Sequence, residues 1–364
     1  MKNIQEMAKL KFKLFFYGIK STNEELIQLK TLGYRVPAFV RTGASYGIEA
    51  IVEKLVPVNI PLNPNSPIRF SKDFKSLLIG NKFLCKIDIL KSATFSLTNK
   101  QEKETNEAAR ICFDRLGITL YGGCHFKEIK RGCKFCGVDI SRHFRAKKIL
   151  TPMQVVELVD DALSIPDHGI RHILLSGGVL AEYEFGAKRI AETAVKLKTR
   201  YPDLPIYVMM PPPSKNETLQ YLIDSGIDEI AFNIEIMNND IRKKIAPAKD
   251  EIGISRYFSA LEYLSLNLPQ FGARSILMGG IEPFNSTLKG VEELSKRGVM
   301  PIISYYRVIG NTVPSLFRTE EDVYNLWESA VEIAEKYDMV IGPTCIPCQN
   351  NVISLPTNNY FKFY

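Results

Sequence analysis

The sequence predicts an α/β fold in which a partial or complete (β/α) barrel follows an N-terminal α+β extension. From residue 117 onward, short apolar runs alternate about six times with stretches of helical periodicity, as the βαβ units of a parallel sheet do. The glycine-rich turn that opens a dinucleotide-binding sheet is missing from the first of these units, which favours a barrel over an open sheet. The chemistry of such a barrel belongs to the loops at the carboxyl ends of its strands.

The elements of the barrel follow one another in a regular order along the chain. Apolar runs predict strands at 117–121, 171–176, 205–210, 229–235, 273–278 and 301–306, with a last short strand at 339–341. Helical periodicity predicts helices at 152–165, 187–200, 216–224, 257–266, 287–297 and 320–336. Before the barrel, a helical start precedes β-like runs at 50–58 and 83–90. We therefore predict three parts, an N-terminal extension at 1–108, a barrel at 109–337 and a C-terminal tail at 338–364.

Composition and charge exclude several classes of protein. Hydrophobic residues make up 45% and charged residues 24% of the 364 residues, as in ordinary globular proteins. No apolar run is long enough to span a membrane, and the charged first residues do not form a secretory signal. The net charge of +7 is mild and does not by itself predict a nucleic-acid partner. Seven cysteines with two C-x-x-C pairs favour metal or redox chemistry over disulfides, and therefore the cytoplasm.

Three cysteines lie on the loop that follows the first barrel strand. Eight residues lie between Cys124 and Cys133, and two lie between Cys133 and Cys136. Thiolates suit a soft metal, either zinc or an iron–sulfur cluster. Three ligands leave one iron of a cluster open, whereas a structural zinc site is closed by four. The alternative is such a zinc site, formed by Cys133 and Cys136 together with Cys345 and Cys348.

Later strands also end in residues suited to binding a ligand. The second strand ends in Ser176-Gly177-Gly178, where glycines allow a close approach to the backbone. The fourth strand ends with Asn233 and Glu235, two residues apart and therefore on one side of a strand. Gly279 and Glu282 follow the fifth strand. We expect these groups to meet at one end of the barrel.

Together these features resemble the radical S-adenosylmethionine (SAM) superfamily, over about residues 109–313. Its signature is a three-cysteine loop after the first barrel strand that ends aromatic–Cys, as Phe135–Cys136 does here. The usual first gap is three residues, so the gap of eight departs from the pattern. The resemblance implies a TIM-like barrel, a 4Fe–4S cluster on Cys124, Cys133 and Cys136, and SAM bound at the open iron.

The resemblance also implies contacts to SAM. A Gly-Gly-Glu segment commonly receives its amino group, polar residues after the fourth strand grip its ribose, and an apolar–x–Gly–x–x–Glu segment passes its adenine. Val179 replaces the glutamate of the first segment, so an acidic contact there would come from Glu182 or Glu184. The implied cofactor contacts are Phe135, Ser176, Gly177, Gly178, Asn233, Glu235, Gly279 and Glu282.

Within the superfamily, the sequence resembles the biotin synthase and lipoyl synthase branch, and it is closest to an uncharacterised family of that branch. The stretch from Asn233 to Pro247 resembles the matching region of both, and Gly310-Asn311-Thr312 resembles a turn of the biotin synthase branch. The long first cysteine gap, the N-terminal extension and the segment Pro247-Ala248-Lys249 are similar to an uncharacterised family associated with nitrilase-type gene clusters. The resemblance implies reductive cleavage of SAM to a 5′-deoxyadenosyl radical, which takes a hydrogen atom from a small-molecule substrate.

Partners and a second site are predicted from the remaining charged and cysteine residues. Basic side chains cluster on the cysteine loop and its sequel: Lys127, Lys130, Arg131, Lys134, Arg142, Arg145, Lys147 and Lys148. They suit an acidic electron donor such as ferredoxin or flavodoxin, an anionic substrate, or a solvated loop. Cys345 and Cys348 are expected on the same barrel face as the first cluster, where Cys85 or Cys112 could join them in an auxiliary iron–sulfur cluster. A thiol redox pair and a structural role are the alternatives.

Three functions remain open at this stage. The first is a radical SAM enzyme acting on a small molecule. The second is radical SAM modification of RNA or protein, although residues 1–110 show no nucleic-acid recognition motif. The third is a non-redox zinc-binding barrel protein. Residues 41–47 add either an anion-binding backbone turn or a plain surface loop.

Overall fold

The barrel is built on one curved sheet of seven strands. The computed structural model describes residues 3–36, 47–91, 108–137, 149–308 and 313–356. Strands β7 to β12 pair in parallel in chain order, and β6 pairs antiparallel with β7 at one edge. The strands are β6 (Ala109–Cys112), β7 (Arg115–Thr119), β8 (His172–Ser176), β9 (Ile206–Met209), β10 (Glu229–Ala231), β11 (Ala273–Gly279) and β12 (Met300–Tyr305). Within the described residues β6 and β12 do not pair, so the expected (β/α) barrel is the partial form.

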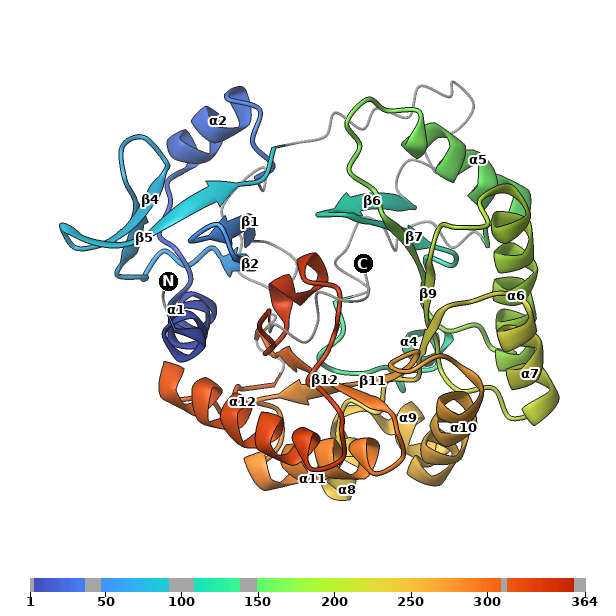
Figure 1. The fold of residues 1–364 in the computed structure, drawn as a ribbon. Coiled ribbons are helices and arrows are strands. Elements are labelled where there is room, and N and C mark those ends of the chain that lie inside the picture. The colour runs from blue at the N-terminus through green and yellow to red at the C-terminus, as the bar shows by residue number, and fades with distance from the viewer. Residues whose placement is uncertain (1–2, 37–46, 92–107, 138–148, 309–312, 357–364) are drawn as a thin grey trace.

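An outer ring of helices surrounds these strands (Figure 1). Its members are α5 (Pro152–Leu163), α6 (Tyr183–Arg200), α7 (Asn216–Asp224), α10 (Ile254–Asn267), α11 (Phe284–Ser295) and α12 (Glu320–Glu335). Capping boxes at Thr151 and Thr319 fix the starts of α5 and α12, because each threonine hydroxyl accepts a hydrogen bond from a backbone N–H in the first turn of its helix. Three short helices lie in loops after strands: α4 (His125–Glu128), α8 (Asn239–Ile245) and α9 (Pro247–Ile252). No described helix is long and apolar enough to cross a membrane.

The N-terminal extension combines two helices with a separate antiparallel sheet of order β2-β1-β5-β4-β3. Its elements are α1 (Ile4–Tyr17), α2 (Asn23–Thr31), β1 (Gly47–Val52), β2 (Val56–Pro61), β3 (Ile68–Phe70), β4 (Ser76–Ile79) and β5 (Lys82–Ile89). Helix α1 packs on α12, where the rings of Phe12 and Trp327 lie 6.0 Å apart. One continuous apolar core therefore runs from the extension into the barrel. The proposed division into three parts remains a prediction.

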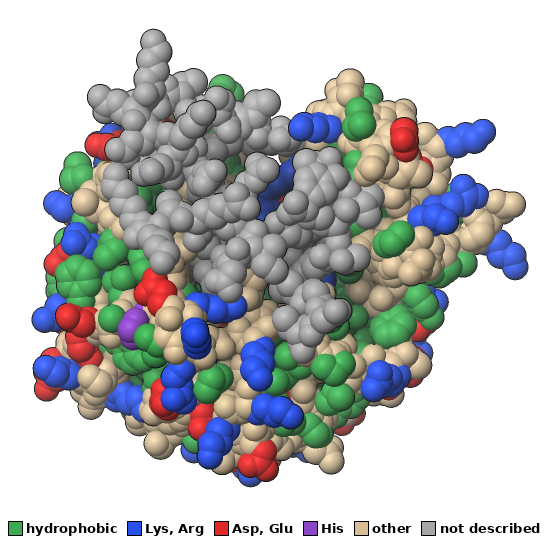
Figure 2. Space-filling model, turned by 180° about the vertical axis from the view of Figure 1, so that it is seen from behind, with side chains coloured by type: hydrophobic (Ala, Val, Ile, Leu, Met, Phe, Trp, Pro, Cys, Tyr) green, Lys and Arg blue, Asp and Glu red, His purple; other side chains and the backbone are tan. Residues whose placement is uncertain are grey.

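The C-terminal segment lies inside the ring of helices and crosses the open side of the barrel (Figure 1). It contains the short 3-10 helix η2 (Pro347–Asn351). Ile353 N–H donates to the Ile303 carbonyl of β12 at 2.7 Å, and the buried amino group of Lys11 donates to the carbonyls of Gln349 and Ser354, each at 2.6 Å. The face in Figure 2 mixes basic with acidic side chains around residues that are not described. The charge of the cysteine loop therefore follows from the residues of the loop itself.

Three of the predicted strands differ in the structure. The run 50–58 is a hairpin of β1 and β2, because Glu53 and Lys54 turn with φ of 52° and 59°. The run 229–235 is strand only at Glu229–Ala231, since Glu235 adopts a φ of 70° and keeps a single bridge to Leu277. The expected strand 339–341 is wrong: these residues follow the turn at 336–338 and do not form a strand, although Gly342 N–H donates to the Pro301 carbonyl of β12 at 2.9 Å.

Several predicted features lie outside the described residues. They are the turn Gly310-Asn311-Thr312, most of the segment 41–47, and the basic residues Arg142, Arg145, Lys147 and Lys148.

Candidate functional site

An open cavity lies at the carboxyl ends of the barrel strands. Its volume is about 290 Å³, at the lower end of the range of small-molecule and cofactor sites. Most of the predicted site residues line it together: Cys124, Cys133, Cys136, Phe135, Ser176, Gly177, Gly178, Asn233 and Glu235. The cavity therefore unites the ends of β7, β8 and β10, as the barrel rule predicts.

The cysteine loop is fixed at both ends by backbone hydrogen bonds. Cys124 directly precedes α4, and the turn between the other two cysteines is closed by a bond from Cys136 N–H to the Cys133 carbonyl, 3.2 Å. Lys134 N–H donates to Ile245 of α8 at 2.9 Å. Cys133 is buried whereas Cys136 is exposed. The three cysteines line one cavity, and their exposure increases from Cys133 through Cys124 to Cys136.

Burial also sets the proton affinity of the inner thiol. It raises the pKa of Cys133 to about 12, although the nearby Lys249 ammonium opposes the shift. The thiol therefore carries its proton at neutral pH until a cation displaces it, as metal ligation by cysteine requires.

The two glycines after β8 pack directly against the cysteine loop. A Cβ on Gly178 would lie 1.4 Å from the carbonyl oxygen of Gly123, and one on Gly177 would lie 2.9 Å from backbone atoms of Tyr121. Gly178 N–H donates to the Tyr121 carbonyl at 2.9 Å. Any side chain at Gly178 would push the two loops apart. The glycines are thus required for the shape of the site itself.

A buried lysine joins the polar groups after β10. Nζ of Lys249, on α9, donates to the Asn233 carbonyl at 2.5 Å and to Glu235 Oε1 at 3.2 Å. Burial is the largest single effect and lowers the pKa of Lys249, but Glu235, together with Tyr257 and Cys133, outweighs burial, so the pKa is raised and the ammonium stays charged. The side-chain carbonyl of Asn233 accepts the N–H of Ile276 at 3.1 Å. Both residues are therefore held in place by the protein before any ligand binds.

Sequence reasoning did not include several of the residues that line this cavity, Lys249 and Tyr257 among them. Lys249 was singled out only as part of the segment Pro247-Ala248-Lys249, which was the one signal for it. Tyr257 lies on α10, with its ring centre 5.8 Å from Lys249 Nζ. It carries no sequence signal, since an aromatic residue on a helix usually packs in the core.

Gly279 and Glu282 do not line this cavity. The fully buried carboxylate of Glu282 accepts the N–H groups of Met237 and Asn238 at 3.1 and 2.7 Å. It thereby holds the loop between β10 and α8. A Cβ on Gly279 would meet the side chain of Ile303 at 2.9 Å. Their role as cofactor contacts stays a prediction.

The glutamates suggested to replace the missing acidic contact are not in the cavity lining either. Glu184 accepts hydrogen bonds from Ser214 N–H at 2.6 Å and from Lys215 N–H at 3.1 Å, and also from the Thr218 hydroxyl. It therefore caps the start of α7. Glu182 lies directly before α6.

The second cysteine pair lies at the other end of the barrel, so its predicted place beside the first cluster is wrong. Cys345 and Cys348 contact Asp114, which precedes β7, and His172, the first residue of β8. The cavity begins at Ser176, the last residue of β8. At about 3.3 Å per residue, the strand separates the two groups by roughly 13 Å.

Two further predictions about this cysteine pair are also wrong. The prediction of one zinc site formed by Cys133 and Cys136 together with the second pair is wrong, because the two cysteine pairs lie at opposite ends of the barrel strands. Cys85 is buried in β5 of the other sheet, and the thiol of Cys112 contacts Glu49 at 3.3 Å. Neither belongs to the group formed by Cys345 and Cys348.

The fold and the cavity define a partial (β/α) barrel that carries three cysteine thiols on its first loop, at the carboxyl ends of its strands. The family model described as "Radical SAM superfamily" matches residues 118–314. The chain belongs to the radical SAM superfamily and is an enzyme. Membership implies a 4Fe–4S cluster and SAM as cofactors.

Proteins similar to this chain differ in the reactions that their names give. The bacteriochlorophyllide c C-7(1)-hydroxylase of Chlorobaculum limnaeum is 25% identical over 213 residues, 54% of this chain and 53% of that protein. The chain thus spans about half the length of the curated relative it matches. The FeFe-hydrogenase maturase HydG from Carboxydothermus hydrogenoformans is 15% identical, with a TM-score of 0.47 over 65% of this chain and 57% of that one. A radical SAM methyltransferase from Sphaerobacter thermophilus is 13% identical, with a TM-score of 0.46 over 77% of each chain.

Proposed function

We propose that this radical SAM enzyme holds its cluster on Cys124, Cys133 and Cys136 and acts on a small-molecule substrate in the adjoining cavity. One observation carries the proposal: the three thiols share a cavity with the glycine pair and the polar pair that the resemblance assigns to SAM. Three ligands leave one iron open for SAM. When bound, the cluster and SAM supply the reductive cleavage that yields the hydrogen-abstracting 5′-deoxyadenosyl radical.

The protein's own part is to bind, orient and shield. The backbone at Gly177 and Gly178 is positioned to receive the methionine end of SAM, while Asn233 and Glu235 are positioned for its ribose. Lys249 holds Glu235 in its left-handed conformation, a strained state that surrounding contacts must maintain. We assign Phe135 to the cofactor side of the cavity, in keeping with its position beside Cys136.

The substrate space is bounded by apolar side chains. Val179, Met209, Met210 and Pro211 form this wall of the cavity. Apolar walls exclude water and competing hydrogen donors from a radical reaction. We therefore propose a substrate with an unactivated C–H bond. Hydroxylation, the reaction in the name of the Chlorobaculum limnaeum relative, is one such outcome, and the biotin and lipoyl synthase-like branch remains a prediction.

The electron donor is proposed from charge next to the rim of the cavity. Lys130 and Lys134 are exposed on the loop that also carries the exposed Cys136. Arg131 pairs with Glu251 at 2.7 Å and is less free to contribute. An acidic ferredoxin or flavodoxin would meet this loop with complementary charge. We place the enzyme in the cytoplasm, where reducing conditions preserve thiols.

The test is anaerobic purification followed by incubation with SAM and dithionite. Wild type should be brown and form 5′-deoxyadenosine, whereas Cys124→Ala and Cys136→Ala should lose both properties. Cys85→Ala is the matched control, because that cysteine lies in the separate N-terminal sheet, and it should keep both. Deuterium transfer from candidate substrates into 5′-deoxyadenosine then identifies the substrate. Retention of SAM cleavage by both loop variants would refute the assignment.

A further inference from the structure

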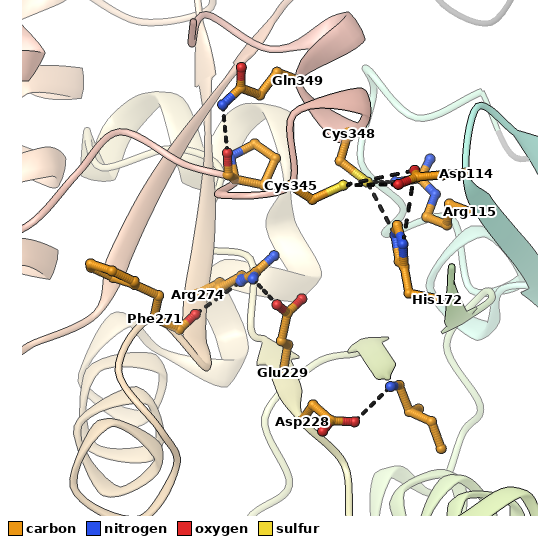
Figure 3. Close-up of polar contacts among 12 residues, drawn as sticks. Asp114, Arg115, His172, Asp228, Glu229, Phe271, Arg274, Cys345, Cys348 and Gln349 are labelled. Carbon is orange, nitrogen blue, oxygen red and sulfur yellow. Dashed lines mark hydrogen bonds and ion pairs between the residues drawn. The ribbon is translucent and has the colours of Figure 1, made fainter. Parts of the chain in front are cut away.

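Four side chains of metal-ligand type converge at the amino ends of the barrel strands (Figure 3). They are Asp114, His172, Cys345 and Cys348, and one ligand atom of each lies within 4.8 Å of the other three. Asp114 comes from the turn before β7 and His172 from the start of β8. Both cysteines come from the C-terminal segment. The group is separate from the SAM cavity and does not depend on the function proposed for it.

The spacing of these atoms is that of ligands around one ion. Cys348 Sγ lies 3.2 Å from His172 Nε2, and Cys345 Sγ lies 3.7 Å from Asp114 Oδ2. A tetrahedral zinc ion with bonds of about 2.0–2.3 Å separates its ligand atoms by about 3.3–3.8 Å. An iron–sulfur cluster holds its thiolates farther apart, because the liganded irons are themselves separated by sulfide bridges.

The surroundings also fit an enclosed cation. Three of the four side chains are buried, and Asp114 is partly exposed. Buried thiols and a buried imidazole need hydrogen-bond partners or a metal to offset the loss of water. Four ligands close the coordination sphere, as in structural rather than catalytic zinc sites. We propose that Asp114, His172, Cys345 and Cys348 bind one structural zinc ion.

Arg115 supplies the remaining charge. A divalent ion with two thiolates and one carboxylate carries a net charge of minus one. Nη1 of Arg115 lies 3.8 Å from Cys348 Sγ, and its buried Nε has no hydrogen-bond partner among the described residues. The guanidinium therefore neutralises the ion and its ligands as a whole. Such outer partners orient and tune metal ligands.

The ion would close the open side of the partial barrel. The C-terminal segment is bound to β12 by the backbone bond from Ile353 and to α1 by Lys11. The segment also packs on β2 through η2, and Cys345 and Cys348 connect it to β7 and β8, near the other edge of the sheet. Zinc at this point links the two edges through the segment. Its binding free energy then adds to the stability of the closed fold.

The experiment measures zinc and iron separately in wild type and four variants. Wild type should contain about one zinc per chain in addition to its cluster iron. Cys133→Ala should lose iron and keep zinc. His172→Ala and Cys345→Ala should lose at least about nine-tenths of the zinc, since removing one ligand of four opens the site. Cys112→Ala, a nearby cysteine outside the group, should keep both metals.

A measurement on unaltered protein guards against variants that fail to fold. Zinc X-ray absorption of wild type should show two sulfur ligands at about 2.3 Å and two nitrogen or oxygen ligands at about 2.0–2.2 Å. Replacement by cobalt should give the visible absorption of a tetrahedral thiolate site. Two results would overturn the proposal: iron with acid-labile sulfide that depends on Cys345, or a metal-free, reducible Cys345–Cys348 disulfide.

Discussion

The two cysteine groups of this barrel differ in the way that separates a reactive metal site from a structural one. At the carboxyl ends, Cys124, Cys133 and Cys136 come from one loop and border an open cavity. At the amino ends, Cys345 and Cys348 meet two residues from distant parts of the chain in a mostly buried group. Three ligands and open space leave a site for a second molecule, whereas four ligands exclude one. Residue type alone would not tell these groups apart.

The largest expected effect is a double dissociation between the two ends. Cys133→Ala should lower 5′-deoxyadenosine formation by at least about 1,000-fold, roughly 4 kcal/mol in barrier terms, because the cluster is lost. Cys345→Ala should keep cleavage per bound cluster within a few-fold but unfold roughly 10 °C lower, because a structural ion is lost. Thermal unfolding and product assays on both variants check this. Loss of both properties in both variants would contradict the separation.

A glycine substitution sharpens the comparison at the reactive end. Gly178→Ala forces a methyl group onto the Gly123 carbonyl, where an ideal Cβ would lie at 1.4 Å. We expect a loss of stability above about 3 kcal/mol, or displacement of the cysteine loop with loss of cluster iron. Gly186→Ala is the matched control. Gly186 lies within helix α6, and the atom nearest to its added Cβ would be 3.7 Å away. This control should be neutral or stabilising by about 0.5–1 kcal/mol. Denaturant unfolding measures the loss of stability, and iron content measures the loss of the cluster from a displaced cysteine loop.

The two ends also differ in how far they could be predicted. Helix α7 was predicted at its observed bounds, and the cysteine loop in its observed place, because periodicity and loop position are local signals. The group at the amino ends joins Asp114 to a cysteine 231 residues away, and no spacing in the sequence encodes such a contact. Likewise, the left-handed backbone at Glu235 depends on Lys249 and Leu277, which local pattern cannot reveal.

The buried lysine of the reactive end gives an intermediate effect. Lys249→Met leaves the Glu235 carboxylate without its cation, and a buried charge without its partner costs about 1–3 kcal/mol. If Glu235 orients SAM, the dissociation constant of SAM should rise roughly 10- to 100-fold in Lys249→Met. Lys249→Arg should restore part of the affinity, because it restores the charge. Equilibrium binding of SAM to the cluster-loaded protein measures this, and an unchanged affinity in Lys249→Met would remove Lys249 from the site.

The buried lysine at the C-terminal segment predicts a dependence on pH. Burial lowers the pKa of Lys11 well below its ordinary value of 10.5. Between the lowered pKa and about 10.5, the unfolded chain binds a proton that the folded chain does not, so stability rises with pH in that window. Lys11→Met should remove this part of the slope, while Lys9→Met, exposed on the same helix, should not. Urea unfolding at several pH values tests it, and identical slopes in wild type and Lys11→Met would contradict it.

The smallest expected effect concerns the charge around the exposed cysteine. Lys130→Glu with Lys134→Glu should slow reduction by flavodoxin about 3- to 10-fold at low salt, and less at high salt, because exposed charges steer encounter and are screened. With dithionite, a small reductant that needs no docking surface, SAM cleavage should be unchanged. Lys188→Glu with Lys196→Glu, both exposed on helix α6, carries the same change in charge away from the loop and should leave reduction by flavodoxin as it is. Equal slowing by the two double variants would show that net charge, and not this loop, directs the donor.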